Sequence, residues 1–171
     1  MKYPKVFIMF IPIILMGKKI GFEDAINYSL FETASIGWTI PVPNEDAFVI
    51  RGKAKNSHTW YKVALPAMDT TLFLDSAAFN YNGDVFYVEN LSFAKTGNKL
   101  LVKTASKKIW RHSNTGTYFI YDLVEKNLET LTHDNENLRN VKFSPDGSRV
   151  AYVREDNNVY VYELGRKKES R

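Results

Sequence analysis

The residues of this 171-residue sequence whose types could do chemistry do not form a catalytic set. The three histidines, His58, His112 and His133, are scattered without the ligand spacing of a metal site. The absence of cysteine excludes disulfides, thiolate catalysis and cysteine-bound metals. The sequence also lacks a G-x-S-x-G motif, the strained turn that exposes a serine nucleophile. We therefore predict that these residues hold no catalytic group, no metal and no cofactor.

Arg111 is the one residue that we expect to contact a substrate, and it lies in the segment KIWRHS at residues 108–113. A guanidinium is planar, always charged and rich in donors, so it can orient a peptide carbonyl or a carboxylate. Such a group positions a substrate and does not make or break bonds. The alternative is a surface arginine that caps the end of a strand and pairs with a nearby acid. Spacing alone does not separate these two roles.

The acidic residues offer no second site. Glu23-Asp24 and Glu45-Asp46 are adjacent pairs, but both lie in turn or loop contexts, where we expect solvated side chains. Asp146, in the turn segment FSPDG, is expected to accept hydrogen bonds from its own turn, as aspartate does at such positions. Metal binding at Asp146 is not expected.

The element nearest to a complete structural unit is the segment from Phe143 to Leu164. Its apolar and aromatic residues alternate with period two on both sides of a polar triplet at residues 156–158, which predicts two strands joined by a tight turn. The turn residues at 145–147 precede them and indicate a third strand before. One such unit cannot bury both of its faces, so we expect neighbours of the same kind.

The same order of strands and turns recurs along the chain. Strands ending at Trp38, Phe93 and Phe143 each lead through a turn to further apolar and aromatic strands, at steps of roughly fifty residues. This period predicts an all-β fold, a partial β-propeller of four-stranded antiparallel blades. The blades are placed at about residues 34–75, 88–132 and 138–171, and the segment 79–83 is treated as a connector.

The third predicted blade has only three recognisable strands, so the count is about two and three-quarter blades, and a fourth strand belongs at residues 166–171. A propeller needs about four to eight blades to close. Exposed strand edges are a liability, so we expect this sequence to be the amino-terminal part of a longer protein or to complete itself with a partner.

Composition is consistent with this fold and argues against a nucleic-acid partner. The ten tyrosines and eleven phenylalanines favour strands. The net charge is +4, but the basic residues cluster only in the final segment 165–171, which we expect to be a solvated end. Alternation along strands predicts that the tyrosines pack between blades and do not form a stacking platform for a ligand; these are Tyr118, Tyr121, Tyr152, Tyr160 and Tyr162.

The first residues have the features of an export signal. Lys2 and Lys5 precede an apolar run from Val6 to Met16, which is too short to span a bilayer comfortably. We expect residues 1–19 to be a signal peptide or an uncleaved signal-anchor, which makes the protein periplasmic, extracellular or membrane-anchored. A buried first strand is the alternative. The segment from Phe22 to Ile26 is expected to begin a short helix or turn.

The block WRHS at residues 110–113, followed by YFIYDL at 118–123 and one blade later by FSPDG, resembles the amino-terminal propeller of the dipeptidyl peptidase IV family. This family lies within the prolyl oligopeptidase clan of serine peptidases. The segment from Phe22 to Ile26, followed by Trp38, also resembles the beginning of that domain. The resemblance covers nearly everything after the apolar leader.

The resemblance implies a propeller of about eight blades stacked on an α/β-hydrolase domain that carries the serine, aspartate and histidine. Its members remove dipeptides from peptide amino-termini and prefer proline or alanine second. Two propeller glutamates, in a motif DWxYEE, hold the substrate ammonium, but this sequence contains no such motif. Only the WRHS arginine, which reaches the substrate carbonyl, can be carried over, onto Arg111. Alone, these 171 residues are expected to be inactive.

Two functions therefore stay open. The first is the amino-terminal propeller of an exported dipeptidyl peptidase, with a peptide as substrate and a hydrolase domain missing from these residues. The second is a non-enzymatic propeller, TolB-like or WD-like, that binds protein partners, since one fold serves both classes. A protein of three blades would require oligomerisation, for example as a homodimer, to cover its edges.

Overall fold

The computed structural model describes residues 38–52, 58–111 and 113–171. The predicted leader, the segment from Phe22 to Ile26, and His112 lie outside these ranges. Within them, no helix is both long and apolar enough to cross a membrane.

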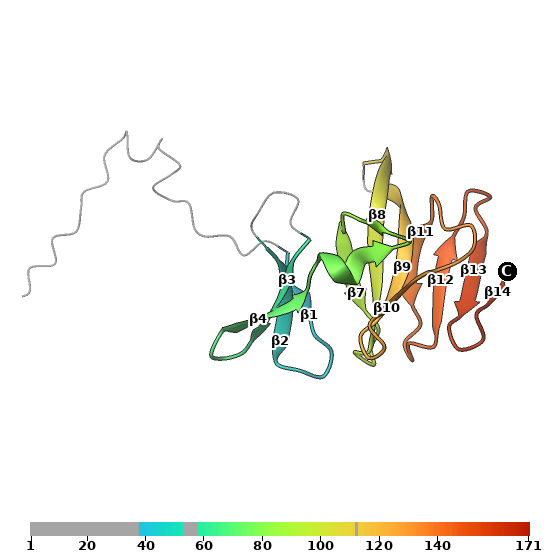
Figure 1. Cartoon of the computed structure of the whole chain (residues 1–171). Helices are drawn as coiled ribbons and strands as arrows, with labels where there is room; N and C mark the ends of the chain where they lie inside the picture. Colours follow the sequence, from blue (N-terminus) through green and yellow to red (C-terminus); the bar gives the residue numbers. More distant parts are fainter. Residues whose placement is uncertain (1–37, 53–57, 112) are drawn as a thin grey trace, which may run out of the picture. The chain divides into compact units, whose positions relative to one another are not determined.

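The described residues fold into three antiparallel sheets of four strands each, which confirms the predicted fold class. In the first two sheets, consecutive strands are neighbours (Figure 1). The first sheet contains β1 (Ile40–Pro41), β2 (Ala47–Arg51), β3 (Trp60–Ala64) and β4 (Asp69–Leu74). The second contains β7 (Asn90–Phe93), β8 (Lys99–Trp110), β9 (Ser113–Asp122) and β10 (Asn127–Thr130).

The third sheet also has four strands, one more than its sequence pattern shows. It consists of β11 (Arg139–Phe143), β12 (Arg149–Val153), β13 (Val159–Glu163) and β14 (Lys168–Ser170). The predicted hairpin is the β12–β13 pair, in which Val150 lies opposite Tyr162. The additional strand β14 pairs with β13, with Glu169 opposite Tyr162. It is polar because it lies at the edge of the sheet, so it carries no hydrophobic alternation.

A short connector joins the first sheet to the second. It begins with the 3-10 helix η2 (Ser76–Phe79), where the carboxylate of Asp75 accepts a hydrogen bond from the amide of Ala77 at 2.9 Å. A two-stranded ladder follows, formed by β5 (Asn80–Tyr81) and β6 (Asp84–Val85). Phe79 is fully buried, so the connector contributes to the core.

The core explains why β8 is apolar on both faces. Leu100 and Val102 belong to a cluster that also contains Val49 and Trp60 of the first sheet. Leu101, between them in sequence, belongs to a second cluster with Val150 of the third sheet. Successive strand residues point to opposite faces, and each face of the second sheet is covered by another sheet. The alternation expected of a half-exposed strand is therefore replaced by a continuous apolar run.

The tyrosines pack between sheets, as the sequence analysis predicts. Tyr121 is buried in the first cluster and Tyr152 in the second. The rings of Tyr152 and Tyr160 are stacked with their centroids 6.1 Å apart. Tyr118, Tyr160 and Tyr162 are partly buried against the second cluster.

Equivalent turns of consecutive sheets touch one another. A Cβ added at Gly97, in the turn between β7 and β8, would lie 3.6 Å from the carbonyl oxygen of Pro43 in the turn between β1 and β2. A Cβ added at Gly147, between β11 and β12, would lie 3.3 Å from Oγ1 of Thr96. Gly147 also has φ +71°, a conformation that favours glycine. The repeated turn thus contributes contacts between sheets.

Arg51, at the end of β2, links the first sheet to the segment before β7. Its guanidinium donates hydrogen bonds to the hydroxyl of Tyr87 and to the carbonyl oxygens of Val88 and Glu89. The same group stacks on the rings of Trp60 and Tyr87, at 4.9 Å from each centroid. The side chain of Arg51 therefore supplies hydrogen bonds to two backbone carbonyl groups that lie just before the second sheet.

Candidate functional site

The hairpin of β8 and β9, called the β8–β9 hairpin below, is the longest element among the described residues. β8 has 12 residues and β9 has 10, whereas the other strands of these sheets have two to six. The residues from Leu100 to Thr104 are largely buried, and those from Ala105 to Trp110 are exposed. Figure 1 shows β8 extending past the ends of the neighbouring strands. The hairpin thus has a base inside the sheet and a free end outside it.

The exposed part begins at an irregularity in the ladder. The register shifts between Thr104, which pairs with Thr117, and Lys107, which pairs with Thr115. At this point Ala105 adopts φ +45°, a left-handed conformation that is unusual for a residue other than glycine. Such a bulge breaks regular pairing and re-aims the strand, so the direction of the free end is set here.

Side chains replace the backbone bonds that the bulge removes. The amide of Ser106 donates to Oε1 of Glu89 at 2.8 Å, and the hydroxyl of Ser106 donates to the carbonyl oxygen of Thr115 at 3.2 Å. The hydroxyl of Thr115 donates to the carbonyl oxygen of Lys107 at 3.3 Å. These bonds join the two strands of the hairpin and tie them to Glu89, just before β7.

Glu89 is itself held through its backbone. Its amide donates to the carbonyl oxygen of Lys103 at 2.8 Å, and its carbonyl oxygen accepts from Arg51 at 2.7 Å. Burial and then the charge of Glu89 raise the pKa of Tyr118 to about 12, so Tyr118 is a neutral hydroxyl at physiological pH.

The opposite strand of the hairpin is fixed by a bridge to the segment before β11. The amide of Gly116 donates to the carbonyl oxygen of Leu138, and the amide of Leu138 donates to the carbonyl oxygen of Gly116, both at 3.0 Å. A Cβ at Gly116 would lie 2.7 Å from Cε of the flexible Lys103 side chain and 3.2 Å from the carbonyl oxygen of Thr104, so β8 approaches closely here. The base of the hairpin is therefore anchored on both sides.

Arg111 lies in the turn at the free end, next to Trp110, which pairs with Ser113. Arg111 is exposed, and Trp110 is 76% exposed. Among the described residues, no carboxylate pairs with the Arg111 guanidinium and no hydrogen bond from it is formed. The side chain is thus presented to solvent with its donors available to a ligand.

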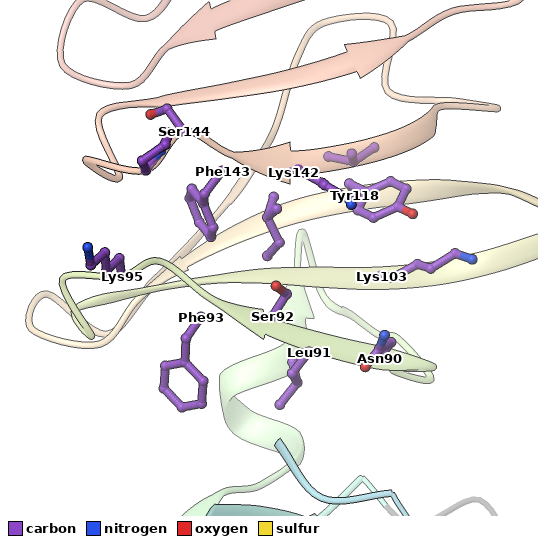
Figure 2. A pocket seen from close by; sticks show the side chains of 13 residues that line it. Asn90, Leu91, Ser92, Phe93, Lys95, Lys103, Tyr118, Lys142, Phe143 and Ser144 are labelled. Atoms are coloured by element: carbon purple, nitrogen blue, oxygen red, sulfur yellow. The ribbon is translucent and has the colours of Figure 1, made fainter. Parts of the chain in front are cut away.

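Three open grooves border the hairpin; one, of about 430 Å³, is lined in part by Lys107, Lys108 and Glu155. Of the other two, the first, of about 470 Å³, lies between the hairpin and β11 and is lined in part by Lys103, Trp110 and Arg139. The second, of about 460 Å³, lies between β7 and β11, where Ser92, Tyr118, Lys142 and Phe143 are among its lining residues (Figure 2). These two grooves can hold a chain rich in hydrogen-bond acceptors, but their lining offers neither a carboxylate nor a histidine as a general base.

The other candidates of the sequence analysis serve local structure. Nδ1 of His58 lies 3.1 Å from the carbonyl oxygen of Phe86, and His133 is exposed on a loop. Glu45 forms an ion pair with Lys62 at the surface. Asp146 accepts hydrogen bonds within its own turn, from the Ser148 amide at 3.1 Å among others, as predicted. These bonds hold the pKa of Asp146 well below its usual range.

Sequence reasoning brought Arg111 to attention but missed Glu89 and Ser106. Their contact joins residues 17 positions apart and exists because Ala105 breaks the ladder. Neither an alanine at φ +45° nor a lone glutamate before a strand has a sequence signal, so no pattern pointed to this pair.

Residues 94–171 match the family described as the dipeptidyl peptidase IV (DPP IV) N-terminal region. Dipeptidyl aminopeptidase B of Saccharomyces cerevisiae is 27% identical over 143 residues, which cover 84% of this chain and 16% of the relative. A crystal structure of Porphyromonas gingivalis dipeptidyl peptidase 4 superposes with a TM-score of 0.70 at 20% identity, over 85% of this chain and 20% of that one. TolB from Acinetobacter baumannii gives a TM-score of 0.51 at 14% identity, over 78% of this chain and 31% of that one.

The two solved structures support the propeller fold, and the family match adds the relationship in sequence. The match includes β8, β9 and the whole third sheet, and therefore the WRHS block with Arg111. The chain spans 16% of the length of the Saccharomyces relative. The chain contains an N-terminal region of the dipeptidyl peptidase IV family, which the family match places at residues 94–171.

Proposed function

We propose that this chain is the substrate-admitting propeller region of a serine-type dipeptidyl peptidase, which releases dipeptides from peptide amino-termini. The hydrolase domain with its nucleophile would lie outside these 171 residues, since the sequence has no G-x-S-x-G motif. The role of this region is to hold the peptide while that domain cleaves it. The relatives' names, dipeptidyl aminopeptidase B and dipeptidyl peptidase 4, support the reaction class.

The observation that carries the proposal is the placement of Arg111. Within the family-matched segment, the long hairpin presents this exposed guanidinium beyond the end of the sheet, on a base anchored by side-chain and backbone hydrogen bonds. A guanidinium carried by an anchored hairpin can donate to a peptide carbonyl and hold the substrate in a reactive geometry.

The test uses the complete reading frame that contains this chain. Its product should release the dipeptide from glycyl-prolyl-p-nitroanilide, and a serine-directed fluorophosphonate should abolish the release. Arg111→Ala should lower kcat/KM by about 10- to 100-fold, the value of one or two hydrogen bonds to a charged group. Arg111→Lys keeps the charge without the planar donors and should restore only part of the loss.

Lys126→Ala is the matched control, because Lys126 is an exposed cation in the turn at the other end of β9. It should leave kcat/KM unchanged. A reading frame that encodes further propeller repeats without G-x-S-x-G, and a product without dipeptide release, would contradict the peptidase and favour a TolB-like binding protein.

We also propose that residues 1–19 direct export, which the charged and apolar pattern of the leader supports. A fusion of residues 1–37 to alkaline phosphatase lacking its own signal should be active in the bacterial periplasm. Replacing Leu15 with Arg in the apolar run should abolish that activity.

Homodimerisation of the complete protein, the remaining expected partnership, is measured by light scattering at several concentrations.

A further inference from the structure

We propose that Glu89 is a positioning residue for Arg111: its carboxylate fixes the direction in which the free end of the β8–β9 hairpin projects. This inference rests on the proposed function for its effect on catalysis. Its structural part concerns only residues described here, so the two are tested separately.

The first step is that the hairpin needs an anchor at Ser106. The register shift after Thr104 and the left-handed Ala105 interrupt the β8–β9 ladder between the buried base and the exposed end. The amide of Ser106 then has no strand partner, and Glu89 supplies one at 2.8 Å. A hydrogen bond to a charged acceptor is roughly twice as strong as a bond between neutral groups.

The second step is that Glu89 is a rigid support. Its amide is bound by the carbonyl oxygen of Lys103 and its own carbonyl oxygen by the guanidinium of Arg51. Arg51 is in turn stacked between Trp60 and Tyr87. The backbone of Glu89 is thus held by both the first and the second sheet. The hydrogen bond from its carboxylate therefore restrains the position of Ser106.

The third step is that, within the part of the chain that the structure describes, no second anchor on the outer half of β8 replaces it. Residues Ala105 to Trp110 are all exposed. The bridge between Gly116 and Leu138 holds β9, the opposite strand, below the free end. Without the Glu89 carboxylate, the outer half of β8 would be held only by β9, through the ladder pairs from Lys107 to Trp110 and the bonds of Ser106 and Thr115. The hairpin would stay paired, but it would swing as a unit, and Arg111 with it.

The test is a double-mutant cycle in the complete enzyme. Glu89→Ala should lower kcat/KM for glycyl-prolyl-p-nitroanilide by about 10-fold when Arg111 is present, but by less than about 2-fold in an Arg111→Ala background, because coupled residues are not additive. Glu89→Gln keeps the acceptor oxygen and should retain most of the activity. A loss of the same size in both backgrounds would show a general structural effect and overturn the proposal.

Hydrogen exchange gives the readout that does not depend on activity. In Glu89→Ala, the amides of residues 105–111 should exchange faster, while those of β12 and β13 should be unchanged. Glu125→Ala removes an exposed glutamate whose carboxylate makes no hydrogen bond among the described residues, and it should change neither measurement.

The outcomes separate the two claims. If no variant, including the wild type, releases a dipeptide but Glu89→Ala loosens residues 105–111, the peptidase function fails and Glu89 still holds the hairpin. If the enzyme is active and exchange in residues 105–111 does not respond to Glu89→Ala, the positioning role is wrong and the proposed function stands.

Discussion

Single carboxylates organise the turns of this protein, and Asp156 is the one whose effect on stability is most directly measurable. Its carboxylate accepts hydrogen bonds from the side chain of Asn158 at 2.7 Å, the hydroxyl of Tyr160 at 2.7 Å and the amide of Asn158 at 3.0 Å. These bonds, the Asn158 side chain first, lower the pKa of Asp156 to about 2. The ionised form therefore stabilises the turn between β12 and β13.

The sign of the pH dependence follows from that direction. The folded pKa lies below the value of about 3.9 in an unfolded chain, so the contribution is fully present above that value and is lost as the pH falls towards 2. Asp156→Asn should lower Tm by a few degrees at pH 6, and the difference from wild type should shrink as the pH falls below about 4 and vanish below pH 2. Asp84→Asn removes an exposed carboxylate that makes no hydrogen bond in the described ranges, and it should not alter the profile. A constant Tm difference across this range would contradict the assignment.

Among the elements, the turn at Gly147 tests whether equivalent turns of neighbouring sheets support one another. Gly147→Ala forces a Cβ into φ +71° and brings it within 3.4 Å of Cβ of Ala94. The left-handed conformation alone costs a non-glycine residue about 1–2 kcal/mol, and the contact adds to it. We expect the urea midpoint to fall accordingly, with the m-value unchanged.

Gly165→Ala is the control for that substitution. Gly165 has no atom within 4 Å of an added Cβ and no left-handed φ, so the midpoint should stay within error or rise slightly. Gly83→Ala, with φ +94° and open space around it, isolates the backbone cost from the contact. If Gly147→Ala and Gly83→Ala lower the midpoint equally, the contact with the neighbouring turn contributes nothing.

How far the elements could be predicted depended on whether they were buried. The hairpin of β12 and β13 was predicted because Val150, Tyr152 and their neighbours alternate against a core. The outer half of β8 was missed, since residues from Ala105 to Trp110 face solvent and carry no period-two pattern. β14 is a polar edge strand and was recognised only by counting. The anchor at Glu89 depends on the fold around it, which no local pattern encodes.

At the scale of the whole molecule, Arg51 is expected to control how firmly the first sheet is attached to the rest. Arg51→Leu leaves the carbonyl oxygens of Val88 and Glu89 without their donor and should cost about 2–3 kcal/mol. Because the lost bonds join the first two sheets, hydrogen exchange should accelerate in β1 to β4 more than in β11 to β14.

Lys62→Leu, on the same sheet, removes only a surface ion pair with Glu45 and should change stability by less than about 0.5 kcal/mol. Equal effects of the two substitutions, or uniform acceleration of exchange in all three sheets by Arg51→Leu, would show that Arg51 is not a specific link between sheets.

The length of the β8–β9 hairpin sets the reach of Arg111. A strand advances by about 3.4 Å per residue, and side chains return to the same face every second residue. Lengthening each strand of the hairpin by two residues would therefore move the guanidinium about 7 Å outward and keep its orientation. Because Ala105 to Trp110 are exposed, such a change leaves the buried core untouched. The length of the hairpin therefore sets how far Arg111 projects from the sheet, and it can change without any change to the buried core.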